Sequence, residues 1–153
     1  MHGLITPVGS FFWNLDENVG LRSPNLAEDV QYVQFGYYCM AQPESGDLAT
    51  PEEKEVFARV IPGANYTAAE SDPLTVAIRL HQAKRGGVQD GHVSSVRGKT
   101  GGYTQGTETR SFMLNTLYVA CYRVLKDRFP RLDQHPRCPT LVADKSRYVF
   151  TLD

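Results

Sequence analysis

The residues of this chain best suited to bind a metal or to act as nucleophiles are four histidines and three cysteines, spread over 153 positions. They are His2, His81, His92, His135, Cys39, Cys121 and Cys138. A helical zinc site places two histidines four residues apart, and a small metal-binding loop uses a C-x-x-C pair. Neither spacing occurs in this sequence. We therefore expect no metal site and no cofactor.

The cysteines are too widely spaced for a disulfide framework, and their number is odd. A catalytic thiol needs an exposed, electropositive setting that favours the thiolate. Cys39 and Cys121 lie on apolar faces of expected helices and are predicted to be buried thiols. A disulfide between them is left open, because the two helices could pack together. Only Cys138, beside Arg137 and three residues after His135, has neighbours that could activate it.

The acidic residues offer little for catalysis. Glycoside cleavage requires two carboxylates that face each other across a cleft. Asp72, Asp90 and Glu108 lie at expected helix ends or turns, where acidic side chains commonly cap the backbone. We interpret them as capping residues. The nucleophile motif G-x-S-x-G is absent as well.

Residues 86–104, GGVQDGHVSSVRGKTGGYT, contain a Gly-Lys-Thr triplet like that of phosphate-binding loops. Such a loop also needs a glycine five positions before its Gly-Lys pair, and it joins a strand to a helix. Here Val93 occupies that position, and the stretch follows an expected helix. We predict a polar connector between helices, or a rim loop that can approach a sugar or a peptide closely.

Two helix starts carry capping signals. Asn25, followed three residues later by Glu28, predicts a capping box and a helix that begins near residue 26. Thr50 as N-cap, Pro51 at the first helical position and Glu53 predict a second, short helix.

Further elements follow along the chain. Asp72-Pro73 opens a third helix, which Gly86-Gly87 ends. A fourth helix is expected from about Thr107 to Phe129, and its wide apolar face predicts a central position. Short β-branched or aromatic runs near both termini, GSFFWNL, TLVA and RYVFTL, predict strands, with the last two forming a hairpin. The predicted fold is mainly α: a compact bundle of about four helices with a small antiparallel β element from the termini.

Composition limits the functional classes. With 41% hydrophobic residues, 22% charged residues and a net charge of −1, the chain is typical of a soluble globular domain and lacks the positive field that favours nucleic-acid binding. No run approaches the roughly 18 apolar residues of a membrane span, so we expect no membrane insertion. The first residues lack a secretory signal, which predicts a cytoplasmic location or export without a cleaved signal peptide.

Two segments resemble bacterial peptidoglycan-binding-like modules: residues 18–34, NVGLRSPNLAEDVQYVQ, and residues 74–100, LTVAIRLHQAKRGGVQDGHVSSVRGKT. His81 stands where that family usually has an aromatic residue, and the region between the segments is longer than usual. The matching positions, in order, are Val19-Gly20, Asn25, Asp29-Val30, Val33-Gln34, Ala77-Ile78, Gln82, Asp90-Gly91 and Thr100.

The resemblance implies a compact three-helix unit with a shallow groove. We expect a single domain, 1–153, with a peptidoglycan-binding-like core at 18–106, an insertion at about 41–71, and a central helix with a C-terminal hairpin extension at 107–153. The implied function is non-catalytic recognition of cell-wall glycan or stem peptide. Exposed tyrosines stack well on sugar rings. The candidate ligand-binding residues are Tyr37, Gln82, Asp90, His92 and Arg97.

Two other functions remain as alternatives. The chain could be a protein-interaction factor, such as an adaptor, chaperone or immunity partner in a bacterial secretion or phage-like system. The missing signal peptide favours that hypothesis, because a cytoplasmic protein does not meet the wall unless something delivers it. A cell-wall hydrolase ranks last. The oligomeric state is left open.

Overall fold

The structure is a computed structural model that describes residues 1–5, 9–96 and 113–151. Its α-helices are α1 (Ala27–Ala41), α2 (Pro51–Phe57), α3 (Pro73–Arg85), α4 (Met113–Leu125) and α5 (Thr140–Phe150). Three 3-10 helices join them: η1 (Pro43–Leu48), η2 (Lys126–Arg128) and η3 (Leu132–Gln134). Strands β1 (His2–Ile5) and β2 (Phe11–Asn14) form one antiparallel pair, and β3 (Val19–Gly20) and β4 (His92–Val93) form another. The predicted fold class, mainly α with a small antiparallel β element, is confirmed.

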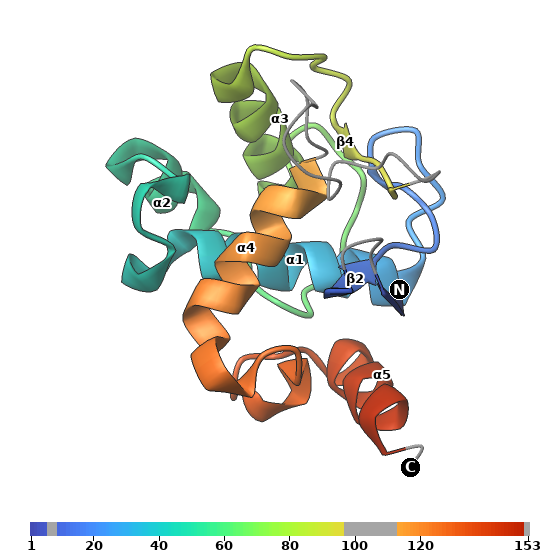
Figure 1. Cartoon of the computed structure of the whole chain (residues 1–153). Coiled ribbons are helices and arrows are strands. Elements are labelled where there is room, and N and C mark those ends of the chain that lie inside the picture. Colours follow the sequence, from blue (N-terminus) through green and yellow to red (C-terminus); the bar gives the residue numbers. More distant parts are fainter. Residues whose placement is uncertain (6–8, 97–112, 152–153) are drawn as a thin grey trace.

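Helix α1 lies at the centre of the fold and is crossed by α4 (Figure 1). Ten of its residues are buried, on nearly every side of the helix, so α1 occupies the core together with α4. The crossing is close because Gly36 faces Leu117: a Cβ added at Gly36 would lie 2.9 Å from the Cβ of Leu117. Helices α2 and α5 also pack against α1, and α3 packs on α2.

The second and third predicted helices form as expected. The Thr50 hydroxyl accepts a hydrogen bond from the Glu53 amide at 3.2 Å, and the Glu53 carboxylate accepts one from the Thr50 amide at 3.1 Å, which completes the capping box. Asp72 caps α3 by accepting from the Leu74 amide at 2.9 Å, and Gly86 ends that helix with a φ of 70°.

The predicted capping box at α1 does not form. Leu26 is the N-cap and provides no side-chain hydrogen bond. Asn25 turns back instead: its side chain accepts from the Gly20 amide at 2.7 Å and donates to the Gly20 carbonyl at 2.9 Å. Glu28 binds the N-terminal ammonium of Met1. Both residues therefore hold neighbouring segments against the start of α1.

The predicted C-terminal hairpin is wrong, because residues 140–150 form α5. Val142, Ala143 and Ser146 are its buried residues, which is the spacing of one helical face and not of a strand. Asp144 and Lys145, which separate the two predicted strands TLVA and RYVFTL, lie in the middle of this helix. The β structure of the described chain comes from β1 to β4 only.

The fourth helix is observed from Met113 to Leu125, and its predicted start at Thr107 lies outside the described residues. Lys126 has a φ of 54°, so the α-helical backbone ends before the predicted Phe129. None of the helices in the described ranges is long and apolar enough to cross a membrane.

Candidate functional site

The two segments that carry the family resemblance lie side by side. Strand β3 pairs with β4 in an antiparallel register that places Val19 opposite Val93 and Gly20 opposite His92. The Leu21 amide also donates to the Gly91 carbonyl at 2.9 Å. Gly20 has a φ of 126°, and a Cβ there would lie 2.3 Å from the Gly91 oxygen, so only glycine fits this contact.

The side chain of Gln82, in α3, holds the turn that precedes β4 against that helix. This side chain is 4% exposed, and every polar atom of the amide is used. Nε2 donates to the Asp90 carboxylate at 2.8 Å and to the His92 carbonyl at 3.0 Å, while Oε1 accepts from the Gly91 amide at 2.9 Å. Gln82 and Asp90 therefore position the loop, and His92 presents a half-buried side chain at its end.

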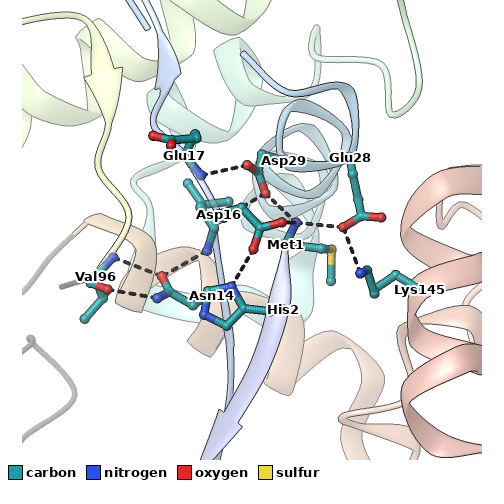
Figure 2. Close-up of polar contacts among 10 residues, drawn as sticks. Met1, His2, Asn14, Asp16, Glu17, Glu28, Asp29, Val96 and Lys145 are labelled. Atoms are coloured by element: carbon teal, nitrogen blue, oxygen red, sulfur yellow. Dashed lines mark hydrogen bonds and ion pairs between the residues drawn. The ribbon is translucent and has the colours of Figure 1, made fainter. Parts of the chain in front are cut away.

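Two asparagines that sequence reasoning missed hold the segment after β4. Asn14 donates to the Val96 carbonyl and accepts from the Val96 amide, both at 2.9 Å (Figure 2). Asn18 accepts from the Ser95 amide at 3.0 Å. A single asparagine beside a short strand is common in sequences, so no local signal predicts these contacts. We call the β3–β4 pair with Gln82, Asn14 and Asn18 the clasp.

Tyr37 is not available as a stacking residue, so this expectation is corrected. The whole side chain is buried, since the face of α1 that carries it is covered by α2 and α3. Its hydroxyl shares a hydrogen bond of 3.0 Å with Nδ1 of His81. Burial, and to a smaller degree the charge of Arg85, lowers the pKa of His81 to about 4. His81 is thus a neutral core residue. The predicted Arg97 lies outside the described residues.

The cysteines are not activated nucleophiles. Cys39 and Cys121 are buried free thiols, and the disulfide left open between them is not formed. Burial, followed by a hydrogen bond with Cys121, raises the pKa of Cys39 well above its usual value. Burial is also the main cause that raises the pKa of Cys138 to about 12, and the charge of Arg147 only partly opposes it. Within the described residues no group of histidine, cysteine and acidic side chains is arranged to hold a metal ion.

Three carboxylates converge on the N-terminal ammonium of Met1 (Figure 2). The nitrogen lies 2.6 Å from Asp29, 2.7 Å from Glu28 and 2.9 Å from Asp16. Burial lowers the pKa of this amine, but the hydrogen bonds with Asp29, Glu28 and Asp16 together outweigh burial and raise it. Asp29 also accepts the backbone amide of Glu17 at 2.9 Å. The cluster ties the first strand to α1, and its carboxylates are occupied by that task.

An open hollow of about 730 Å³ lies between η1 and the end of α4, and we call it the Tyr122 hollow. Its lining residues are Glu44, Tyr122, Arg123, Lys126, Asp127 and Phe129. The sequence does not predict it, because the hollow joins residue 44 to residues 122–129, which are far apart along the chain. Tyr122 and Arg123 lie next to the buried apolar face of α4, and this position is the only sequence feature that indicates them.

Within the described residues, the clasp, where His92 is half-buried, and the Tyr122 hollow are surfaces that could contact a ligand. No family model matches the chain, and no significant match is found among the curated proteins or the solved structures, so its function must be argued from this geometry.

Proposed function

We propose that this chain is a non-catalytic binding module similar to bacterial peptidoglycan-binding domains, and that it binds cell-wall glycan or stem peptide. The observation that carries the proposal is the clasp. Residues 18–34 and 74–96, which hold most of the resembling positions, meet through the β3–β4 pair. Gly20, Asn25, Gln82 and Gly91 are matching positions, and each has a defined role in that contact.

A binding role fits the state of the reactive side chains better than a catalytic role. The thiols of Cys39 and Cys138 have raised pKa values because of burial. The imidazole of His81 is buried and neutral, and the Asp72 carboxylate caps α3. These groups stabilise the fold, whereas a catalytic group needs access to substrate and a pKa near the working pH.

Sedimentation with purified insoluble peptidoglycan tests the proposal. The expected result is saturable retention of the chain in the pellet, with release by soluble wall fragments. An unrelated protein of similar size and net charge serves as the control. Retention no better than that of the control would contradict the proposal.

A second candidate, a protein-interaction factor of a bacterial secretion or phage-like system, is favoured by α5. Leu141 and Tyr148 are 39% and 61% exposed and lie seven residues apart, on one face of the helix. The test is purification from the native host. A stoichiometric partner that is lost in the Tyr148→Ala variant supports this function, and a chain that purifies alone argues against it.

A further inference from the structure

The Tyr122 hollow combines two aromatic rings with four charged side chains. Tyr122 is 56% exposed, and its ring meets Phe129 edge to face, with the ring centroids 5.6 Å apart. Phe129 makes a second edge-to-face contact with Tyr118 at 5.1 Å, which anchors it to the fold. The hollow therefore has a fixed apolar wall at Phe129 and an accessible aromatic rim at Tyr122, a combination typical of recognition sites.

Arg123 lines the hollow and is held in place by hydrogen bonds. Its Nη1 donates to the Ser45 carbonyl at 2.7 Å and to the Asp47 carboxylate at 3.1 Å. These bonds join α4 to η1, which line the hollow together with η2. A guanidinium has five N–H donors, so hydrogen-bonding capacity remains for a ligand. Because the side chain is already ordered, a ligand that binds it loses less conformational entropy.

The other charged groups of the hollow are not occupied by hydrogen bonds or ion pairs within the described chain, although the charge of Glu44 also acts on Cys39 and His135. The side chains of Glu44, Lys126 and Asp127 form no hydrogen bond or ion pair with any described residue. Lys126 also has a φ of 54°, a backbone conformation that is uncommon outside glycine and asparagine. Strained backbone of this kind concentrates at functional sites. The hollow thus presents two cations and two anions beside its aromatic wall.

We propose that the Tyr122 hollow binds a short zwitterionic peptide, whose carboxylates pair with Arg123 and Lys126 and whose ammonium pairs with Glu44 and Asp127. The aliphatic part of the peptide packs on Tyr122 and Phe129. This inference rests on the proposed wall-binding function and deepens it, because the stem peptide is the part of the wall polymer that carries both ammonium and carboxylate groups.

The charge pattern selects this ligand class over others. A neutral acetylated sugar could stack on Tyr122 and hydrogen-bond with the charged side chains, but it carries no charge that would pair with theirs. A polyanion such as a nucleotide is repelled by Glu44 and Asp127. Only a ligand that carries both positive and negative charges pairs with all four charged side chains of the hollow. Such complementary charges contribute to specificity more than to affinity.

The test is calorimetric titration of the whole chain with the synthetic pentapeptide L-Ala-γ-D-Glu-L-Lys-D-Ala-D-Ala. We expect saturable binding that weakens as ionic strength rises, because the charged groups are open to solvent. Capping the peptide by acetylating both amines and amidating all its carboxyl groups should weaken binding by about tenfold or more. Equal affinity for the capped and uncapped peptides would overturn the proposal.

Two variants with matched controls locate the site. Tyr122→Ala and Lys126→Asn should each weaken peptide binding by about tenfold. Asparagine is chosen because it tolerates the left-handed backbone at residue 126. Ile61→Ala and Lys84→Asn are the controls, since Ile61 is 60% exposed, Lys84 belongs to α3, and neither residue lines the hollow. Unchanged affinity in both hollow variants would overturn the assignment.

The outcomes separate this inference from the proposed function. If the chain sediments with the wall, and Tyr122→Ala sediments equally well while the peptide shows no binding, the hollow assignment fails and the wall-binding function stands. If the peptide binds at the hollow but the chain does not sediment with the wall, the hollow assignment stands and the wall-binding function fails. If neither occurs, both are overturned.

Discussion

The hydroxyl of Tyr37 and Nδ1 of His81 lie 3.0 Å apart in the interior, where Tyr37 is fully buried and His81 is 3% exposed. The pair joins α1 to α3, and Phe57 of α2 packs against both rings. The imidazole therefore occupies a position suited to an aromatic ring and uses the tyrosine hydroxyl as its polar partner.

This pair predicts a pH dependence of stability. Burial lowers the pKa of His81 to about 4 from 6.5, so the unfolded chain binds a proton in that interval and the folded chain does not. The neutral imidazole of His81 therefore makes its full contribution to the free energy of unfolding above pH 6.5. This contribution is lost as the pH falls toward 4. Between pH 7.5 and 4.5 the free energy of unfolding should fall by roughly 2 to 3 kcal/mol because of this group.

Urea unfolding of the wild type and of the double variant Tyr37→Phe, His81→Phe measures that contribution. The double variant removes both polar partners together, so neither is left buried and unpaired. Its free energy of unfolding should depend much less on pH between 7.5 and 4.5. The same pH dependence in both proteins would show that His81 does not titrate as inferred.

Gln82 should be among the most sensitive polar residues. The Gln82→Ala variant loses three hydrogen bonds and leaves the Gly91 amide without its acceptor, so we expect a loss of about 2 to 4 kcal/mol in the free energy of unfolding. Gln89→Ala, in the exposed loop seven residues later, is the matched control and should change stability by less than about 0.5 kcal/mol. Hydrogen exchange at Gly91 should accelerate in the first variant and stay unchanged in the second.

Asp29 should stabilise the chain through the Met1 ammonium. It is fully buried, so Asp29→Asn should lower the free energy of unfolding by about 2 to 4 kcal/mol at pH 7. Glu55→Gln, at a side chain that is 78% exposed, is the control and should have a small effect.

The same cluster predicts behaviour at alkaline pH. The pKa of the Met1 amine is raised above 8.0 in the folded chain. The charged amine therefore makes its full contribution to the free energy of unfolding below pH 8.0, and this contribution is lost as the amine deprotonates at higher pH. Thermal unfolding at pH 7 and pH 10 should show a larger loss in the wild type than in Asp29→Asn. A larger loss in the variant would contradict this account.

Gly36 should resist replacement, although alanine is the better helix former. Helix propensity favours Gly36→Ala by about 1 kcal/mol, but the new methyl would lie 2.9 Å from Leu117, and overpacking of this kind costs about 1 to 3 kcal/mol. We expect a net loss of stability. In the Leu117→Gly background the Cβ that lies 2.9 Å from the new methyl is absent, so Gly36→Ala should become neutral or stabilising there. A double-mutant cycle with no coupling would contradict the packing explanation.

Several elements could be predicted because their causes are local. Thr50 and Glu53 satisfy each other's backbone within a single turn, and Asp72 caps a residue two positions away. Gly86 supplies the left-handed backbone that ends α3. In each case the interaction involves a few consecutive residues, so the sequence pattern contains all the information needed.

The candidate site could be predicted only in part. Gln82, Asp90 and His92 do gather in one place, but they do so mainly to hold the loop. Tyr37 could not be placed, because a tyrosine-rich helix has no sequence feature that says which rings are covered. The Tyr122 hollow was missed, since it joins residue 44 to residues 122–129.

By itself the sequence determined the helical class and two helix starts. The tertiary structure decided the roles of Asn25, Tyr37 and residues 140–150. Asn25 binds Gly20 and leaves α1 without its cap, while packing of Val142, Ala143 and Ser146 makes a helix from residues with strand propensity. The physical reason is the same throughout: contacts between distant segments contribute more free energy than the local preference that they override.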